Sequence, residues 1–288
     1  MNNKFSVIII VALLTGLASC MNSYNIEGSA EHPGLDNSIV YLKIFKKDYL
    51  KNADYAEMMY GDFLQYLKNV DSTEVVHGKF GLSGTIDSTR IAYLAFDQFL
   101  MPLVLEDGTI KIMMNKDGQK WGGTELNDRL FQFNSKYDSL QIKLDDLDHE
   151  YTLAFMDGLE DMQNDVIPRL RKQNQMIFAS IDSLFTQTVV ENYDNVIAPY
   201  IFMTYAKMQR YPEMTPWVLD IMSKATEKFK KDPFVVFYVD KAKQIQNQAN
   251  GLEQPASVAT PQPPTPNEMA ASSGKEDGDT TKVTKEKK

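Results

Sequence analysis

Residues 101–130 read MPLVLEDGTIKIMMNKDGQKWGGTELNDRL, and the spacing of apolar residues changes within this stretch. Before Gly122 the apolar residues alternate, so that Ile110, Ile112 and Met114 share one face of an extended chain. Beyond Gly122, apolar residues recur at every third or fourth position. A period of two is typical of a half-buried strand, and a period near 3.5 is typical of packed helices. The sequence therefore predicts an α+β fold, in which an N-terminal antiparallel β-sandwich precedes an α-helical hairpin or bundle.

The β-sandwich is assigned to residues 20–122, with about seven short antiparallel strands. Asp107-Gly108 lies between two apolar runs and is the strongest hairpin signal, because glycine readily adopts the positive φ of a tight turn. His77-Gly78 marks a second two-residue turn of this kind. Residues 39–45 (IVYLKIF) are apolar at most positions, which is typical of a strand covered on both faces. The expected strands are 24–29, 39–45, two within 74–86, 91–96, 101–106 and 109–114.

Residues 47–70 interrupt the strand pattern, because their apolar residues are spaced nearer to 3.6 than to two. This spacing predicts a short helical insertion between strands. We expect its apolar face to close an open end of the sandwich, and a lid over a ligand is the alternative. The apolar residues are Tyr49, Leu50, Tyr55, Met58, Met59, Phe63, Leu64, Tyr66 and Leu67.

A heptad-like apolar seam runs through residues 126–154, with spacings that alternate between four and three. Thr124 is placed to cap this helix. A second helix is expected over residues 167–188, with Asp165 as its cap and Pro168 in its first turn. The short connection favours an antiparallel hairpin, and a homodimeric coiled coil is the alternative. The seam consists of Leu126, Leu130, Phe133, Tyr137, Leu140, Leu144, Leu147, Tyr151 and Ala154.

The whole of residues 123–250 is predicted to be a helical domain. Thr215-Pro216 and Asp232-Pro233 each combine a capping side chain with a proline at the first helical position, so a helix is expected to begin at each pair. A further helix is expected over residues 194–207 despite Pro199. The pattern therefore indicates a bundle that includes a long hairpin.

Residues 1–19 have the composition of a signal peptide. Lys4 precedes a nearly continuous apolar run, Phe5–Ala18, which is shorter than the ~20 residues of a membrane-spanning helix. The run ends in Leu17-Ala18-Ser19-Cys20, which resembles the lipobox of bacterial lipoproteins. The resemblance implies cleavage before Cys20, a diacylglycerol thioether on its sulfur, and an acyl group such as palmitate on its nitrogen. Several acyl chains together anchor a protein durably.

The predicted anchor lies close to the folded part, because only Met21, Asn22 and Ser23 separate Cys20 from the first expected strand. We therefore expect a lipid-anchored protein of the bacterial cell envelope, at the outer membrane and facing the periplasm. No acidic cluster follows Cys20, so display on the cell surface is not supported.

Residues 251–288 differ in composition from the rest of the chain. Five prolines fall between residues 255 and 266, and no aromatic residue occurs in the segment. A segment so poor in apolar groups cannot offset the entropy of ordering its backbone, so we expect a disordered tail.

The chain of 288 residues carries 39 acidic and 30 basic residues, a formal net charge of −9. Nucleic-acid binders need basic groups that neutralise phosphates, so this class is not expected. Cys20 is the single cysteine, which excludes an intramolecular disulfide and a zinc site built on several cysteines. His32, His77 and His149 lie far apart in the sequence, so no metal centre and no cofactor are expected.

The motifs GxSxG, HExxH, Walker A and GxGxxG are all absent from the sequence. Two acidic clusters could support acid–base chemistry or Ca²⁺ binding, but their positions between seam residues predict a solvated helix face. The 15 methionines are expected to fill the core rather than to bind copper(I). We therefore expect no catalytic residue. The acidic clusters are Asp145, Asp146, Asp148 and Glu150, and Glu160, Asp161 and Asp165.

The aromatic residues of the helical region could line a groove for a sugar or a peptide. Packing in the core or between domains is the interpretation that we favour. The residues concerned are Trp121, Trp217, Tyr193, Tyr200, Tyr205 and Tyr211.

Several short motifs occur in order along residues 24–130. Together they resemble the domain of unknown function found N-terminal to the thioredoxin-like domain of bacterial thiol–disulfide interchange lipoproteins. The resemblance extends loosely over residues 131–248, and it implies a β module followed by a helical segment. The motifs are Tyr24-x-Ile26-x-Gly28, Ile39-Val40-Tyr41-Leu42, Asp71-Ser72-x-x-Val75-x-x-Gly78-Lys79-Phe80-x-x-x-Gly84, Pro102-x-x-Leu105-Glu106-x-Gly108-x-Ile110 and Gly123-Thr124-x-Leu126-Asn127-Asp128.

The thioredoxin-like domain is not part of the resemblance. In those lipoproteins a CxxC pair in that domain carries the chemistry, whereas here the predicted tail stands where the domain would begin, without a second cysteine. Thiol–disulfide exchange needs an attacking thiolate, and none remains once Cys20 is acylated. The resemblance therefore implies location and architecture, but no catalytic residue.

These observations predict a non-catalytic lipoprotein of the cell envelope that binds or scaffolds an unidentified envelope protein. The alternative is an accessory of a thiol–disulfide or stress system, which acts through a partner and has no redox site of its own. An enzyme that uses converging carboxylates is a third hypothesis.

Overall fold

The computed structural model describes residues 22–31, 34–97, 99–116, 118–156 and 160–251, with only the backbone described at 160–165. The predicted signal peptide (1–19), the lipidation at Cys20 and the predicted tail beyond Gly251 lie outside the described residues, as does His32. Within the described ranges, no helix combines the length and the apolar character that crossing a membrane requires.

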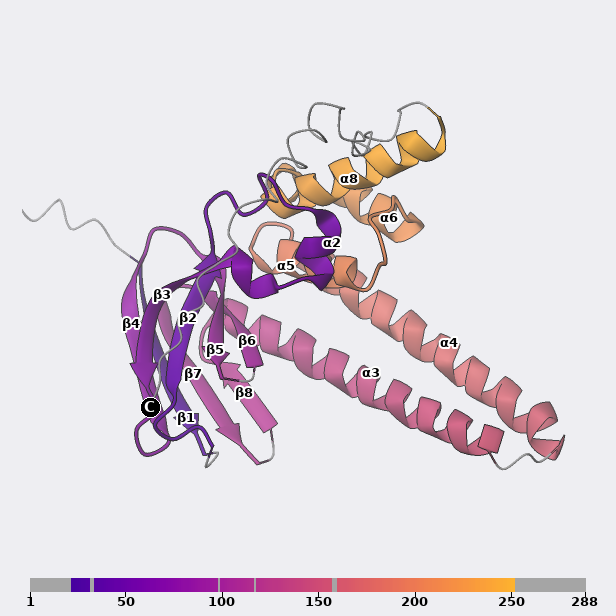
Figure 1. Cartoon of the computed structure of the whole chain (residues 1–288), viewed down its shortest axis with the longest axis horizontal. Coiled ribbons are helices and arrows are strands. Elements are labelled where there is room, and N and C mark those ends of the chain that lie inside the picture. Colours follow the sequence, from indigo (N-terminus) through magenta and orange to yellow (C-terminus); the bar gives the residue numbers. More distant parts are fainter. Residues whose placement is uncertain (1–21, 32–33, 98, 117, 157–159, 252–288) are drawn as a thin grey trace, which may run out of the picture. The chain divides into compact units, whose positions relative to one another are not determined.

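The strands form two four-stranded sheets that share one hydrophobic core (Figure 1). Sheet A consists of β4 (Lys79–Ile86), β1 (Asn22–Ala30), β7 (Gly108–Asn115) and β8 (Gly118–Gly122), in that spatial order. Sheet B consists of β3 (Leu67–Glu74), β2 (Ile39–Phe45), β5 (Arg90–Phe96) and β6 (Phe99–Leu105), also in spatial order. Helices follow the strands in the chain, so the expected α+β class with an N-terminal β-sandwich is confirmed.

Sheet A contains one parallel strand pair, β1 with β7, while every other described pair is antiparallel. On β7, Ile110, Ile112 and Met114 are buried, which confirms the alternation expected of a half-buried strand. The sequence pattern does not predict β8, a five-residue strand that begins and ends with glycine.

Two glycines of sheet A lie directly opposite aromatic residues on the neighbouring strand. Gly28 pairs with Phe80, and Gly84 pairs with Tyr24. A Cβ atom added at Gly28 would lie 2.0 Å from the Phe80 ring, and one added at Gly84 would lie 2.7 Å from the Tyr24 hydroxyl. The aromatic rings therefore cover the backbone of these glycines, which explains structurally why both glycines occur in the motifs of the resemblance.

The expected hairpin at Asp107-Gly108 is wrong. Gly108 has the positive φ that a turn requires, 118°, but β6 pairs with β5 whereas β7 pairs with β1 and β8. The turn therefore carries the chain from sheet B to sheet A. Apolar side chains of β6, from sheet B, and of β7, from sheet A, enter the same core from its two opposite sides. Two adjacent strands of one sheet would enter it from the same side.

The turn at His77-Gly78 is confirmed, but the hairpin around it is not. His77 and Gly78 both have positive φ, 51° and 68°, and a single bridge joins Val76 to Lys79. Beyond this bridge β3 joins sheet B and β4 joins sheet A. The local turn signal thus locates a reversal of the chain, but it does not identify the strands that pair.

The helical insertion is shorter than predicted. It comprises α2 (Tyr55–Tyr60) and the 3₁₀ helix η2 (Phe63–Tyr66), and Leu67–Val70 belong to β3 instead. Tyr55, Met58 and Met59 are buried in the core of the helical region rather than in the sandwich core. Phe63 of η2 contacts Phe45 and Tyr93 of sheet B edge to face. The insertion therefore covers part of sheet B, while the buried side chains of α2 pack among the helices.

The strand covered on both faces is β5, not β2. Five consecutive residues of β5, 92–96, are buried. On β2 the buried residues Val40, Leu42 and Ile44 alternate with more exposed ones, and Ile39 is 47% exposed. Both strands are inner strands of sheet B, so the difference comes from the second face: Tyr93 of β5 is covered by Phe45 and by Phe63 of η2.

An antiparallel hairpin of two 32-residue helices, α3 (Glu125–Met156) and α4 (Glu160–Glu191), follows the sandwich (Figure 1). This confirms the expected hairpin. Helix α4 begins before the predicted start, so Asp165 is not its cap and Pro168 lies inside the helix. Inside the helix Pro168 has no N–H to donate to the preceding turn, and its ring crowds the carbonyl four residues before it.

The base of α3 is joined to β6 through side chains of the last two motifs. Asn127 is fully buried; its Nδ2 donates to the Val104 carbonyl (2.8 Å), and its Oδ1 accepts from the Val104 N–H (2.9 Å). The Glu106 carboxylate accepts from the backbone N–H groups of Leu126 (2.9 Å) and Asn127 (3.1 Å). Glu106, rather than the expected Thr124 side chain, therefore caps α3.

Four further helices complete the fold: α5 (Ile197–Lys207), α6 (Pro216–Lys224), α7 (Glu227–Lys230) and α8 (Pro233–Ala249). Thr215 accepts from Val218 N–H at 3.2 Å, and Asp232 accepts from Phe234 N–H at 2.9 Å, so both expected caps are confirmed. Helix α5 begins three residues after the predicted start, which places Pro199 in its first turn, where proline is tolerated.

Candidate functional site

The described acidic cluster lies along the exposed side of α3, where Asp145 and Asp148 border a groove between α3 and α4. Asp145, Asp146 and Asp148 are exposed on α3, and Glu150 forms an ion pair with Arg169 of α4. The side chains of the second cluster, Glu160, Asp161 and Asp165, lie outside the described residues. Within the described part of the chain, no group of three His, Cys, Asp or Glu side chains could hold a metal ion.

Most of the aromatic residues singled out in the sequence pack in the core of the helical region. Trp217 stacks on Tyr205 with ring centroids 3.8 Å apart, and its Nε1–H donates to Thr186 at 2.7 Å. The Tyr193 hydroxyl donates to the Ile221 carbonyl at 2.8 Å. These contacts favour the packing interpretation for Trp217, Tyr193 and Tyr205.

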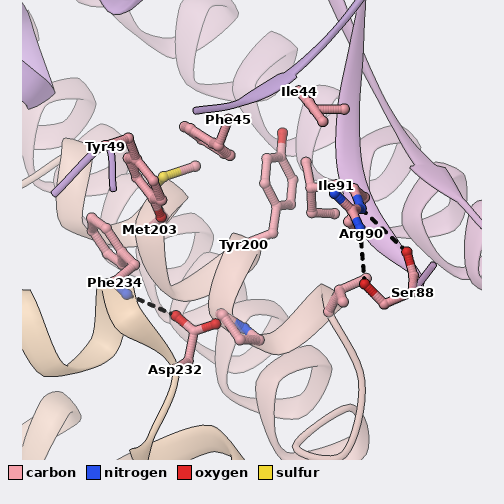
Figure 2. Close-up of a pocket in the computed structure, with 12 residues that line it drawn as sticks. Ile44, Phe45, Tyr49, Ser88, Arg90, Ile91, Tyr200, Met203, Asp232 and Phe234 are labelled. Carbon is pink, nitrogen blue, oxygen red and sulfur yellow. Dashed lines mark hydrogen bonds between the residues drawn. The ribbon is translucent and has the colours of Figure 1, made fainter. Parts of the chain in front are cut away.

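A pocket of about 340 Å³ lies between sheet B and the helices α5 and α8 (Figure 2). Four separate parts of the chain build it: the end of β2 with the following loop, the start of β5, the first turns of α5, and the start of α8. Its walls are largely apolar and aromatic, and the volume falls within the range of small-ligand sites. The apolar lining is provided by Ile44, Phe45, Ile91, Met203 and Phe234.

Two tyrosines offer hydroxyl groups to this pocket. Tyr49 follows β2 and stacks on Phe45, with ring centroids 4.4 Å apart, and Tyr200 lies on α5. Burial raises the pKa of Tyr200 to about 12 and raises the pKa of Tyr49 further. Both phenols are therefore neutral at physiological pH and can donate hydrogen bonds.

The third hydroxyl of this region belongs to Tyr93 of β5. Its ring contacts Phe45 and Phe63 edge to face, with centroids 5.8 Å and 5.4 Å away. The hydroxyl is buried, and it has no hydrogen-bond partner among the described residues. Burial raises its pKa far above the usual value, with further contributions from Tyr200 and Tyr49, which line the pocket. A buried donor without an acceptor is unusual in a folded protein.

The pocket has one cationic and one anionic lining residue: Arg90 at the start of β5, and Asp232 just before α8. Arg90, at the start of β5, donates from Nε to the Ser88 carbonyl (3.2 Å) and from Nη2 to the Ser88 hydroxyl (2.9 Å), and it pairs with Asp87. Asp232 uses Oδ1 to cap α8. Burial raises the pKa of Asp232, and the hydrogen bonds from Phe234 and Val235 partly oppose this shift.

The sequence pattern places Tyr200 as an aromatic packing residue, Asp232 as a helix cap and Tyr49 in the helical insertion, but it gives none of them a place in a pocket. Arg90 and Tyr93 are not singled out, because the pocket forms only when β5, α5 and α8 come together. Lys207 was missed as well: its Nζ lies 4.0 Å from the centre of the Phe63 ring, and burial lowers its pKa.

The far end of the hairpin is a second candidate. Phe155 and Met156 on α3 are 78% and 75% exposed, whereas Leu130 and Phe185 near the base are fully buried. Tyr151 and Leu153 of α3 are exposed as well, and Met176 and Phe178 are exposed near the middle of α4. A groove of about 410 Å³ runs between the two helices here, lined by Leu147, Tyr151, Leu170, Phe178, Asp148 and Arg171, among others.

Comparison with protein-family models finds one match, over residues 24–130, to a family described as a domain of unknown function (DUF4369). The match begins in β1 and ends in the first turns of α3, and it confirms the resemblance to a domain of unknown function. Comparisons with curated proteins and with solved structures find no match.

Proposed function

Since residues 24–130 are a domain of the DUF4369 family, preceded by a lipobox-like Leu17–Cys20, we propose that this protein is a non-catalytic lipoprotein of the bacterial cell envelope. In this proposal, acyl chains on Cys20 anchor the protein in the outer membrane, facing the periplasm. The helical hairpin then binds or scaffolds an envelope protein.

The observation that carries the binding role is the exposed apolar end of the hairpin. In the half of the hairpin nearest the sandwich, the seam is covered by α4 and by the other helices. In the far half, Tyr151, Leu153 and Phe155 of α3 remain exposed. Contiguous exposed apolar surface on a folded protein is typical of an interaction site.

The groove between α3 and α4 suits an amphipathic helix of a protein partner. Its floor is apolar, and its rim carries Asp145 and Asp148 on one side and Arg171 on the other. An apolar helix face can fill such a groove while charges of both signs on the helix meet the rim. The helices are about 48 Å long at 1.5 Å per residue, so the groove lies well away from the sandwich.

Site-specific photocrosslinking tests this proposal. We would place benzoylphenylalanine at position 155, and at Leu219 as a control, because Leu219 is 52% exposed on α6. We expect one envelope protein to crosslink at position 155 but not at position 219, and Tyr151→Ser, one turn before position 155 and in the lining of the groove, to abolish that crosslink. Crosslinks to a second copy of the chain alone would support the homodimeric coiled coil, and equal labelling at both positions would contradict a site at the hairpin end.

The second candidate function is an accessory of a thiol–disulfide system. It is supported by the domain of unknown function, because this type of domain precedes thioredoxin-like domains in the lipoproteins that the sequence resembles. Recovery of an oxidoreductase at position 155 would favour this role, whereas recovery of a structural envelope protein would favour scaffolding.

A further inference from the structure

We propose that the pocket between sheet B and the helices α5 and α8 binds a small organic carboxylate with an apolar body. The hairpin end plays no part in this site. The binding of a small molecule and the binding of a protein partner can therefore be tested separately.

The polar groups of the pocket are mainly hydrogen-bond donors. Arg90 contributes the one cationic side chain in the lining, and the hydroxyls of Tyr49 and Tyr200 are neutral donors. The Tyr93 hydroxyl does not line the pocket; it is buried without an acceptor among the described residues, so the ligand is expected to meet the lining donors only. A ligand that brings acceptor oxygens would match these donors.

A carboxylate fits better than a more highly charged anion. A single guanidinium faces the pocket, and Asp87 already neutralises part of its charge. Nε and Nη2 of Arg90 already donate to Ser88 and Asp87, so a carboxylate is expected to accept a charge-assisted hydrogen bond from Nη1. A phosphate group would bring more charge than these residues can balance.

The body of the ligand is expected to be apolar and small. Phe45, Ile91 and Met203 offer apolar surface, and a volume of about 340 Å³ accommodates a compact molecule. Figure 2 shows Arg90 and Ser88 on one side of the Tyr200 ring, with Tyr49 and Phe234 on the other side. A carboxylate at Arg90 would therefore place the apolar body against the aromatic rings.

Asp232 indicates which way such a ligand points. Its Oδ1 is committed to the cap of α8, and its negative charge would repel a carboxylate placed beside it. The carboxylate is therefore expected at Arg90, away from Asp232.

Isothermal titration calorimetry with three probes of similar size tests the proposal. We would titrate 3-phenylpropionate, 3-phenylpropanamide and 3-phenylpropylamine into the full chain held in lipid nanodiscs, with empty nanodiscs as the blank. The carboxylate is expected to bind at least about tenfold more tightly than the amide, because it gains charge-assisted hydrogen bonds. Failure of the carboxylate to bind at about 10 mM, or equal binding of the amine, would overturn the proposal.

Three variants locate the interaction. Arg90→Gln is expected to weaken carboxylate binding by about tenfold or more. Asp87→Asn removes the ion pair with Arg90 but keeps the guanidinium, so carboxylate binding is expected to be unchanged or tighter. Tyr200→Phe keeps the aromatic ring and is expected to weaken binding by less than Arg90→Gln. Circular dichroism of each variant would confirm folding. Unchanged affinity in both Arg90→Gln and Tyr200→Phe would place the probe elsewhere and overturn the assignment.

Discussion

The side chain of Asn127 takes the place of a neighbouring strand at the edge of sheet B. It donates to and accepts from the backbone of Val104, as a paired strand would, and it is fully buried. Glu106 holds the first turn of α3 at the same point. Two residues from the motifs thus join the sandwich to the hairpin, so these two motif positions have a structural role.

Replacing Asn127 by alanine should destabilise the protein by about 2–4 kcal/mol, because two buried backbone groups of Val104 lose their partners. Asn134→Ala is the matched control, since Asn134 lies one heptad further along α3 and its Nδ2 has no partner among the described residues. Asn134→Ala should lower the free energy of unfolding by less than about 1 kcal/mol. Urea denaturation monitored by circular dichroism measures both values, and equal losses would contradict the role assigned to Asn127.

Asp232 is the residue from which we expect a pH-dependent effect on stability. Its pKa is raised in the folded state, so the folded protein binds this proton more readily than the unfolded chain does. Stability should therefore fall as the pH rises through the interval between the unfolded and the folded pKa. At pH 7 the buried, ionised Asp232 lowers the free energy of unfolding. This loss disappears at a pH low enough to protonate Asp232 in both the folded and the unfolded state.

Asp232→Asn retains a capping side chain and removes the buried charge. We expect its melting temperature to exceed that of the wild type at pH 7, and the difference to vanish below about pH 4. Asp54→Asn serves as the control, because Asp54 caps α2 at an exposed position. If Asp54→Asn raised the melting temperature at pH 7 by as much as Asp232→Asn does, the effect would not come from the burial of Asp232.

At the scale of the elements, the two halves of the hairpin have different roles. Near the base, Phe185 packs edge to face on Phe133 and Tyr137, with ring centroids 5.0 Å and 5.4 Å away. At the far end, the helices leave Phe155 in solvent. The base is therefore expected to hold the fold together, while the end is available for binding.

Phe185→Ala and Phe155→Ser should separate these roles. The first is expected to lower the free energy of unfolding by about 3–5 kcal/mol, because it leaves a cavity among aromatic rings. The second should change it by no more than about 0.5 kcal/mol, because the side chain is already exposed, yet it should reduce partner capture. Chemical denaturation and affinity capture would be measured on the same samples; a folded Phe155→Ser variant with undiminished capture would contradict a binding role for that residue.

At the scale of the whole molecule, the proposed location rests on one residue, Cys20. Acyl chains on Cys20 would hold the entire protein at a membrane, because each buried methylene adds about 0.8 kcal/mol. Acylation would also remove the single thiol from any redox chemistry. The proposed envelope location and the proposed lack of redox activity therefore depend on the same modification.

Cys20→Ala should release the protein from the membrane fraction into the soluble fraction. Fractionation followed by immunoblotting measures the release, and intact-mass spectrometry of the wild type should show the added mass of the lipid. A Ser19→Thr variant, which keeps Cys20, controls for changes in export. If the Cys20→Ala protein stays in the membrane pellet, the anchor lies elsewhere.

The sequence by itself determined the class of fold and most of its elements. The change of apolar period near Gly122 predicts strands followed by helices, and the helix caps at Thr215 and Asp232 are where the sequence places them. These features depend on neighbours within a few residues, through side-chain alternation, capping and backbone φ. They are therefore visible in a single chain without knowledge of its folded form.

The tertiary structure decided which strands pair and which residues surround a cavity. Asp107-Gly108 predicts a turn between two paired strands, but in the folded chain this turn connects β6 of sheet B to β7 of sheet A. Arg90, Tyr93, Tyr200 and Asp232 meet only when β5, α5 and α8 pack together. Such contacts depend on burying apolar faces of distant segments in common cores, and that balance of free energy belongs to the whole fold rather than to any local stretch.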